Sequence, residues 1–346
     1  GLCVKQRRDS FLGGECLQRI LIIRPGGIGD AVFILPFVRA LRQKYANAEI
    51  DILCERRNRD VFMLQKDLSL SFFCYNNVCS FFSVLKKQYD VIVDTEQWHY
   101  LSAIFCYFSA AAFRIGFVTR PTRRKFFDYG IGYSVQSHES ENFQNLFKPL
   151  LKDDFFPRDA LKAFFINDND ALWGEKNIPK KAVVVSLGAS IAARYLSVDQ
   201  VVRMTRICLD RGFDVVLLGS QQNIDMGKNV RRQVANPRVI DLVGKTTLGQ
   251  AAAIMKSSQI VFASDSGLAH IANAVGAFTV VFFGPGNKAK WQLLGDQSLA
   301  FSLHLPCSPC TFFGYTITTC GKKYDCMRNF DVDKILDTVF KKVLCS

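Results

Sequence analysis

The chain has 346 residues, of which 49% are hydrophobic and 22% are charged. This balance excludes a disordered protein, and the length favours two globular domains over a single hydrophobic core. The formal net charge of +13 calls for an acidic partner or a solvated basic face, so nucleic acid, an anionic membrane surface and an acidic glycolipid are the partner classes to weigh.

The first half of the chain alternates predicted strands with predicted helices. Apolar residues recur at helical spacing over 31–45, where Pro36 predicts a kink, and a second helix is expected over 143–151. Residues 101–113 form an apolar stretch of about 13 residues, and we expect a buried helix there because a membrane span needs roughly 20. Strands are predicted over 20–24, 50–54, 89–94 and 114–117.

The second half restarts the same pattern at residue 182. Its continuous apolar runs are typical of strands that helices cover on both faces, as in parallel sheets. Strands are predicted over 182–188, 213–218, 239–242, 259–263 and 279–283, with helices over 198–210, 248–256, 268–275 and 332–343. We therefore predict an α/β chain of two Rossmann-like domains, 1–165 and 166–346, whose last helix is able to pack back on the first domain. Without a signal-peptide segment, we expect a cytoplasmic protein.

Two glycine-bearing turns, one in each half, carry the functional signal. The turn at 24–30 follows the apolar run 20–23, and the turn at 264–270 follows the run 260–263. Helix N-termini expose unpaired N–H groups and favour anions, so each turn is a natural phosphate or substrate site. Two such turns predict two halves that face a shared cleft and transfer a group between two bound molecules.

The first turn presents a carboxylate, Asp30. Compared with a dinucleotide-binding fingerprint, the segment that starts at Gly27 lacks the third glycine and places this carboxylate where a pyrophosphate would approach. The helix dipole keeps such a carboxylate ionised, which suits a general base acting on an acceptor hydroxyl. Capping of the helix is the alternative role for Asp30.

The second turn carries groups suited to a diphosphate and a sugar. Ser266 and Gly267 offer backbone N–H groups, and Asp265 can accept hydrogen bonds from sugar hydroxyls. His270 lies one helical turn further on, where a structural role is the alternative to a functional one, and no set of zinc ligands accompanies it.

A small-residue loop after the strand at 182–188 adds to this site. Gly188, Ala189 and Ser190 permit the close approach of a ligand, and Arg194 is placed to neutralise phosphate. We therefore expect the second half to bind a nucleotide-diphosphate donor.

Taken together, these motifs resemble those of glycosyltransferase family 9, the ADP-heptose:lipopolysaccharide heptosyltransferases. The resemblance extends over about residues 19–335 and rests on the segments 22–30, 186–190, 241–248, 264–270 and 282–286. It implies a GT-B fold, with two Rossmann-like domains facing a cleft, and an inverting transfer of heptose from ADP-heptose to the lipopolysaccharide inner core. It implies no cofactor for catalysis, since helix N-termini and arginine can stabilise the departing diphosphate.

The resemblance also assigns roles to residues of this chain. Asp30 matches the general base. The implied donor-binding residues are Gly188, Ala189, Ser190, Arg194, Thr246, Asp265, Ser266, Gly267 and His270. The chain departs from the family pattern in three places: Arg194 stands where lysine is usual, Ile191, Ala192 and Ala193 stand in place of a Trp-Pro-rich stretch, and Gln222 and Asn223 stand near the place of an acidic ribose-binding residue.

The basic residues of the first half gain a meaning from this resemblance. An inner-core acceptor carries carboxylates and phosphates, which would attract them. The implied acceptor-binding residues are Gly27, Arg56, Arg57, Arg114 and Arg120, with Arg123 and Arg124 in the same basic cluster. The positive charge also suggests peripheral contact with the cytoplasmic face of the inner membrane.

Four cysteines near the C-terminus have the spacing C-x2-C-x9-C-x5-C: Cys307, Cys310, Cys320 and Cys326. Thiolates at such spacing suit Zn or Fe, and some relatives in the family carry a cysteine-bound iron, so a structural metal is one interpretation. Reduced packing thiols are the other. The remaining cysteines, among them Cys54, Cys74 and Cys106, are expected to be small buried hydrophobes.

Three functions compete at this stage. The first is heptosyl transfer; the second is the same fold with another nucleotide-sugar donor, or with a protein or other glycan as acceptor. The third, a basic nucleic-acid-binding protein, rests on net charge, and we do not expect a nucleic-acid partner because the aromatic residues are not interleaved with arginine and lysine.

Overall fold

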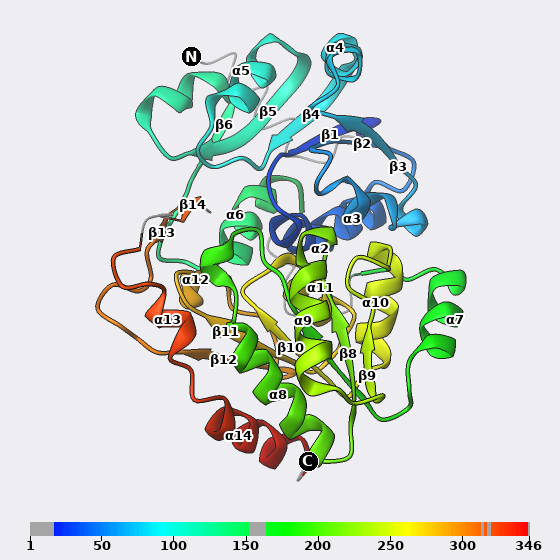
Figure 1. Cartoon of the computed structure of the whole chain (residues 1–346). Coiled ribbons are helices and arrows are strands. Elements are labelled where there is room, and N and C mark those ends of the chain that lie inside the picture. The colour runs from blue at the N-terminus through cyan, green and yellow to red at the C-terminus, as the bar shows by residue number, and fades with distance from the viewer. Residues whose placement is uncertain (1–16, 152–163, 313–314, 317–319, 345–346) are drawn as a thin grey trace. The chain divides into compact units, whose positions relative to one another are not determined.

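The computed structural model describes residues 17–151, 164–312, 315–316 and 320–344. The chain divides into two compact units, Gly1–Ala160 and Leu161–Ser346. Each unit contains one six-stranded sheet whose strands are all parallel, with helices packed on it (Figure 1).

The sheet of unit 1 has the strand order β3-β2-β1-β4-β5-β6. Chain order reverses between β1 and β4, which lie side by side with Ile23 opposite Asp94. The central strands are buried on both faces because both carry helices. The strands are β1 (Arg19–Arg24), β2 (Glu49–Cys54), β3 (Leu70–Cys74), β4 (Gln88–Asp94), β5 (Ala110–Val118) and β6 (Tyr129–Gly132).

The helices of unit 1 connect these strands. On one face, α2 contacts both α3 and α6. On the other, α4 and α5 meet through the rings of Phe81 and Phe105, whose centroids lie 4.9 Å apart. The helices are α2 (Ile28–Lys44), α3 (Arg59–Met63), α4 (Val78–Lys86), α5 (Tyr100–Phe108) and α6 (Glu139–Leu151), with short 3-10 turns η1 (Lys66–Leu68) and η2 (Pro121–Phe126).

The predicted helix over 101–113 is wrong in its second half. The helix ends at Phe108, and β5 begins at Ala110. Ser109 adopts an extended backbone at the end of α5, and its hydroxyl donates a hydrogen bond to the Cys106 carbonyl. An unbroken apolar run hides this change, because a buried helix and a buried strand have the same composition.

The sheet of unit 2 has the strand order β12-β11-β10-β7-β8-β9, so its chain order reverses between β7 and β10. The five strands that the sequence predicted in this half correspond to the first five, β7 to β11, and agree with them to within a few residues. The strands are β7 (Ala182–Ser186), β8 (Asp214–Leu218), β9 (Val239–Asp241), β10 (Ile260–Ser264), β11 (Thr279–Phe283) and β12 (Ser298–Ser302), with a separate antiparallel pair, β13 (Thr311–Phe312) and β14 (Tyr315–Thr316).

Three helices of unit 2 begin with well-defined polar caps. At α8, the Ser197 hydroxyl accepts the Gln200 N–H while the Gln200 side chain accepts the Ser197 N–H, and Thr247 and Gln250 repeat this capping box at α10. At α7, the Asn167 side chain accepts the Asp170 N–H. The helices are α7 (Asp168–Asn177), α8 (Val198–Asp210), α9 (Ile224–Val234), α10 (Leu248–Ser257), α11 (Gly267–Ala274), α12 (Lys288–Trp291), α13 (Asp325–Arg328) and α14 (Val332–Leu344), with 3-10 turns η4 (Ala192–Arg194) and η5 (Gln221–Asn223).

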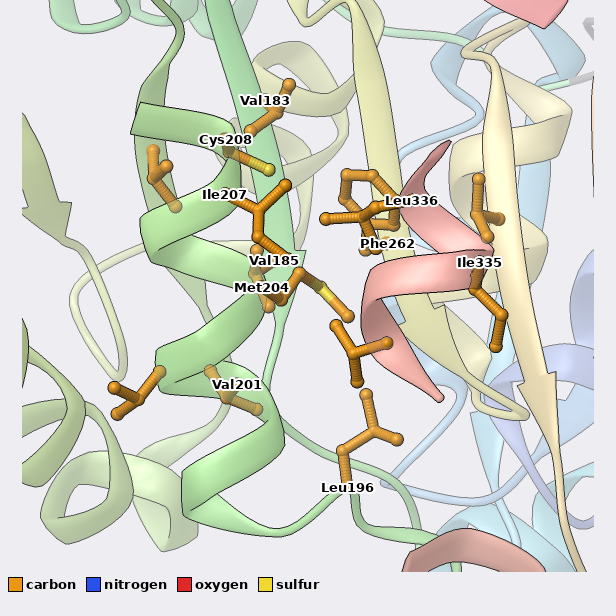
Figure 2. Packing of buried hydrophobic residues seen from close by; sticks show 14 of the residues in the cluster. Val183, Val185, Leu196, Val201, Met204, Ile207, Cys208, Phe262, Ile335 and Leu336 are labelled. Atoms are coloured by element: carbon orange, nitrogen blue, oxygen red, sulfur yellow. The ribbon is translucent and has the colours of Figure 1, made fainter. Parts of the chain in front are cut away.

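The last helix, α14, buries an apolar face within unit 2. Figure 2 shows Ile335 and Leu336 in the same cluster as Met204 and Ile207 of α8. The rings of Phe213 and Phe340 stack at 5.4 Å, and two ion pairs, Arg203 with Asp333 and Arg211 with Asp337, join α8 and the residue after it to α14. The sequence allowed this last helix to pack on the first domain; in the structure, its apolar face packs against α8 of unit 2.

Among the described residues, no helix combines the length and the apolar character that crossing a membrane requires.

Candidate active site

The two predicted turns lie at the switch points of the two sheets. In open α/β sheets, ligands bind at the carboxyl ends of the strands, where the strand order reverses. In unit 1, the turn after β1 lies at the reversal between β1 and β4, and in unit 2, the turn after β10 lies at the reversal between β10 and β7. Topology therefore provides one candidate ligand site in each unit.

In unit 1, Asp30 lies in the first turn of α2 beside a buried arginine. Asp30 Oδ2 is 3.7 Å from Arg24 Nη2, and the Asp30 side chain keeps 29% of its surface exposed, against 2% for Arg24. The Arg24 guanidinium is held in place because it donates to the carbonyls of Pro25, at 2.6 Å, and Thr95, at 2.9 Å. Arg24 is thus a fixed positive charge beneath an accessible carboxylate.

The glycines of this turn leave room for the Arg24 side chain to lie against the backbone beside Asp30. Gly26 has φ +108°, a backbone conformation that side chains disfavour, and a Cβ atom there would lie 2.9 Å from Arg24 Nη2. Gly27 is the N-cap of α2, without a side-chain cap of its own, and its backbone forms a hydrogen bond with Asp30. The capping alternative for Asp30 is therefore compatible with a second role.

Two acidic side chains, Glu96 and Glu139, lie close enough to act on Asp30. Burial raises the pKa of Asp30 above its ordinary value, Arg24 lowers it, and Glu139 and Glu96 raise it again. Glu139 is itself buried, and it accepts hydrogen bonds from the Tyr133 hydroxyl at 2.8 Å and the Gln97 amide at 2.6 Å. The result is a carboxyl group that titrates above the usual range for aspartate.

The sequence did not single out these two acidic residues or assign a role to Arg24. Glu96 stands two residues beyond the predicted strand at 89–94, at the carboxyl edge where the topology places a candidate ligand site. Its position after a predicted strand could therefore have marked it as a site residue. Glu139 opens α6 and reaches the site only through the folding of the chain.

The predicted acceptor-binding arginines differ in how far their charge is already used. Arg56 and Arg57 lie in the loop after β2; Arg57 is exposed and pairs with Glu55 at 2.7 Å. Arg120 follows β5, is exposed, and lies over the Trp98 ring at 3.8 Å. These three occupy the carboxyl edge of the sheet, the edge that also carries Asp30.

Arg114 and Arg123 have structural partners instead. Arg114 lies within β5, where it pairs with Asp128 at 3.3 Å and donates to carbonyls at the end of α5. Arg123 and Asp94 form an ion pair at 3.3 Å with both side chains fully buried, and Arg123 also donates to the Phe117 and Glu96 carbonyls. The expectation that Arg123 belongs to a surface cluster is wrong, because its charge holds the carboxyl ends of β4 and β5 together.

In unit 2, Asp265 and Arg194 form a second charged pair at the switch point. Asp265 Oδ2 lies 3.2 Å from Arg194 Nη1, and both side chains are largely buried. Burial raises the pKa of Asp265, and Arg194 lowers it. Gly286 packs so closely that a Cβ atom there would lie 2.0 Å from Asp265 Oδ2. The position of this carboxylate is therefore fixed by its own loop and by the loops that carry Arg194 and Gly286.

Several buried polar atoms at this edge lack a hydrogen-bond partner in the described residues. They are Ser186 Oγ at the end of β7, Asn223 Nδ2 in η5 after β8, and Ser266 Oγ at the start of α11. Because β8, β7 and β10 are neighbours in the sheet, these three groups share one edge. A buried polar group without a partner costs free energy, so these three groups are candidates for hydrogen bonds to a ligand.

The remaining predicted donor residues surround this edge. Gly188 follows β7 and packs against Asn223, whose Oδ1 would be 2.4 Å from a Cβ atom at that position. Gly267 begins α11, and His270 is buried one turn later, with its backbone N–H donating to the Ser266 carbonyl at 3.4 Å. Ala189 and Ser190 complete the β7 loop, and Thr246 is half-buried in the loop that precedes α10.

The part of the chain that the structure describes gives no support for a metal ion at the four clustered cysteines. No three His, Cys, Asp or Glu side chains there are grouped so as to hold a metal. Cys307 is exposed, Cys310 and Cys320 are half-buried, and Cys326 is buried in the apolar core of unit 2. Burial, followed by the neighbouring thiols, raises the pKa of Cys326 to about 11. The structure thus gives no support to the predicted Zn or Fe.

Of the cysteines expected to be buried hydrophobes, Cys54 and Cys106 are buried and Cys74 is half-buried.

Comparison with known protein families decides the class of this chain. Residues 78–315, more than half of the chain, match the family described as glycosyltransferase family 9 (heptosyltransferase). The chain belongs to glycosyltransferase family 9. Membership decides between the competing classes in favour of an enzyme, a glycosyltransferase.

Curated relatives of this family 9 chain are distant in sequence. It is 23% identical over 314 residues to lipooligosaccharide heptosyltransferase 2 of Haemophilus ducreyi, with 83% of this chain and 89% of that protein covered. It is 22% identical over 303 residues to lipopolysaccharide heptosyltransferase 3 of Escherichia coli, with 79% and 85% covered. A further match, to lipooligosaccharide heptosyltransferase 2 of Haemophilus influenzae, spans only 29% of this chain and 30% of that protein, at 27% identity.

Solved structures confirm the predicted GT-B fold class for this family 9 chain. E. coli ADP-heptose lps heptosyltransferase II gives a TM-score of 0.74 at 17% identity, with 94% of this chain and 99% of that chain covered. A family 9 glycosyl transferase from Veillonella parvula gives 0.70 at 15% identity, with 82% and 85% covered. At these identities the likeness concerns the fold.

Proposed function

We propose that this chain transfers a heptose from ADP-heptose to an acidic acceptor of the lipopolysaccharide inner core, with inversion at the anomeric carbon. The observation that carries the proposal is the set of unpartnered polar atoms at the switch point of unit 2, on Ser186, Ser266 and Asn223. They supply hydrogen bonds of both kinds to a nucleotide sugar, in a family whose curated relatives are named heptosyltransferases.

In this proposal, unit 2 holds the donor. The N–H groups at the start of α11, at Ser266 and Gly267, face the diphosphate, because helix N-termini favour anions. Arg194 shares its charge between Asp265 and the diphosphate, and Asp265 orients the guanidinium through their 3.2 Å contact. The sugar and nucleoside hydroxyls meet the Asp265 and Asn223 side chains.

Unit 1 supplies the base and the acceptor site. Asp30 takes the proton from an acceptor hydroxyl as that oxygen attacks the anomeric carbon of the heptose. The bond from the anomeric carbon to the diphosphate oxygen breaks, and ADP departs with the electron pair, stabilised by Arg194 and the α11 N–H groups. Asp30 then releases its proton to solvent through its exposed surface. No step in this sequence needs a cofactor.

The acceptor is bound by charge. Arg56, Arg57 and Arg120, on the carboxyl edge of the unit 1 sheet, attract the carboxylates and phosphates of an inner-core glycolipid. Arg114 is left out of this set because its guanidinium already serves Asp128 and two carbonyls. We also infer that the reaction takes place in the cytoplasm, at the inner-membrane surface that carries such an acceptor.

Nucleotide binding followed by transfer tests the donor. Calorimetry should show ADP binding more tightly than UDP or GDP, and ADP-heptose should then yield a heptosylated Kdo-bearing acceptor. Binding of UDP or GDP in preference to ADP would assign another nucleotide sugar, which is the second candidate function. Failure to bind any nucleotide would refute the donor site altogether.

Replacement of Asp30 by Asn tests the base. Loss of the base should lower kcat by about 10²- to 10⁴-fold while ADP affinity stays unchanged, since the donor is held by unit 2. Asp60→Asn is the matched control, because Asp60 is an exposed carboxylate on α3 that the mechanism does not use. Turnover of Asp30→Asn within a few-fold of the parent enzyme would exclude Asp30 as the base.

A further inference from the structure

One face of helix α5 is apolar and exposed to solvent. Leu101, Ile104, Tyr107 and Phe108 are exposed by 56%, 39%, 55% and 69%. The opposite face of the same helix, with Ala103, Phe105 and Cys106, is buried in the core of unit 1. Isolated exposed hydrophobic residues are common, but four on one nine-residue helix form a patch, and such patches mark interaction sites.

Neighbouring elements also expose apolar side chains. The exposed Trp98 precedes α5, and α4, whose Phe81 ring contacts Phe105 of α5, exposes Val78 by 70% and Phe82 by 52%. We use "α5 surface" for the exposed side chains of α5 with Trp98 and the adjoining basic turn η2.

The basic turn η2 borders the apolar residues directly. The Tyr107 ring lies 5.9 Å from the Phe126 ring of η2, and the Lys125 ammonium lies 5.1 Å from that same ring. Arg120, over the Trp98 ring, and Arg124 are exposed alongside. The whole segment 97–127 contains no aspartate or glutamate. The α5 surface therefore combines apolar and aromatic side chains with uncompensated positive charge.

We propose that the α5 surface docks unit 1 on the surface of an anionic lipid bilayer. An amphipathic helix binds a membrane interface by placing its apolar side chains at the boundary between headgroups and acyl chains while basic residues meet anionic headgroups. Tyrosine and tryptophan suit that boundary because each has an apolar ring and a polar group. Helix α5 has nine residues, so it lies on the bilayer and does not cross it.

Charge argues against a second copy of this chain as the occupant. A two-fold symmetric contact through the α5 surface would place the same patch against itself and bring Arg120, Arg124 and Lys125 of one copy toward those of the other. An acidic lipid surface neutralises these groups. Nucleic acid would neutralise them too, but it would leave the aliphatic side chains of Leu101 and Ile104 in water.

The location adds a consequence that rests on the proposed function. Trp98 and η2 follow the carboxyl ends of β4 and β5, the edge of the sheet that carries Asp30. Docking through the α5 surface would hold that edge close to the headgroup layer, where a glycolipid acceptor displays its sugar.

Vesicle flotation of the full chain tests the proposal. Vesicles of phosphatidylethanolamine with about 30% phosphatidylglycerol should bind the protein in a salt-sensitive manner, and neutral phosphatidylcholine vesicles should bind it weakly. The charge-neutral double variant Leu101→Gln with Phe108→Gln should lose at least about tenfold in partitioning into anionic vesicles. Its matched control is Leu172→Gln, which removes a 64% exposed leucine from α7 of unit 2 and should leave binding unchanged.

A second pair of variants isolates the charge. Arg124→Gln with Lys125→Gln should weaken binding by about thirtyfold, given about 1 kcal/mol for each basic residue near an anionic bilayer. Arg231→Gln with Arg232→Gln, on α9 of unit 2, removes the same charge elsewhere and should have little effect. Melting temperatures close to that of the parent protein will establish that the variants are folded.

Three results would overturn the proposal. They are failure of the parent protein to bind anionic vesicles, binding of the Leu101/Phe108 variant at the parent level, and an equal loss in the unit 2 controls. If the parent protein is an oligomer, and the Leu101/Phe108 variant is a monomer that still binds vesicles, the α5 surface is a contact between copies of the chain. Transfer to a delipidated, water-soluble acceptor should not change in this variant, so the transferase proposal stands or falls separately.

Discussion

The Arg24–Asp30 pair makes a prediction about the pH dependence of catalysis. Asp30 must be ionised to act as a base, and burial raises its pKa, so activity should fall on the acid side at a higher pH than for an ordinary aspartate. Arg24 opposes this shift. Replacing Arg24 with Met removes the opposing charge, raises the pKa of Asp30 further, and should move the acid limb of kcat/KM to higher pH.

The distance between the two groups sets the size of the effect. Two unit charges 3.7 Å apart interact by about 4 kcal/mol at an effective dielectric constant of about 20. Because 29% of the Asp30 side chain is exposed, water screens the pair, and we expect about 1–2 kcal/mol to remain. Below the pKa of the base, kcat/KM should therefore fall by about five- to thirtyfold, and the loss should shrink as pH rises.

Steady-state kinetics with saturating donor across a range of pH will measure this shift. Arg24→Lys is the matched control, because it loses the guanidinium hydrogen bonds to Pro25 and Thr95 but keeps the charge, and it should retain an acid limb close to that of the parent. An equal loss for Arg24→Met at every pH would refute the electrostatic argument and assign Arg24 a purely structural role. The same conclusion would follow if Arg24→Lys and Arg24→Met behaved alike.

Three further predictions concern the surroundings of the two sites. Gly286→Ala should displace the Asp265 carboxylate and weaken ADP binding at least tenfold in calorimetry, whereas Gly321→Ala, where an added Cβ atom meets nothing within 4 Å, should not. Arg123→Met should leave the fully buried Asp94 unpaired and lower unfolding stability by about 3–5 kcal/mol in urea, with partial recovery when Asp94→Asn is added; an unaltered urea midpoint would contradict this. Arg56→Gln should raise the KM for a soluble acidic acceptor several-fold without changing ADP affinity, and an unchanged KM would remove Arg56 from the acceptor site.

Local sequence pattern was sufficient for the alternating architecture. The strands with continuous apolar runs, such as β1, β4, β7 and β10, could be predicted because burial on both faces requires apolar residues at every position. Within the two parallel sheets, the strands that the sequence did not reveal are β3, β6 and β12. They are only partly buried, and serine or glycine interrupts or borders their short apolar runs. The end of α5 and the start of β5 could not be told apart in the sequence, because both lie within one continuous apolar run.

The sequence by itself also determined the two glycine-bearing turns, because a strand that stops at small residues and opens a helix is a local property. Only the tertiary structure decided what surrounds them. It buried Arg123 against Asp94, paired Arg114 with Asp128, and brought Glu139 close enough to act on Asp30. Charge and spacing along the chain are the same for a buried and an exposed arginine, and the difference lies in which distant carboxylates and carbonyls the fold places beside each one.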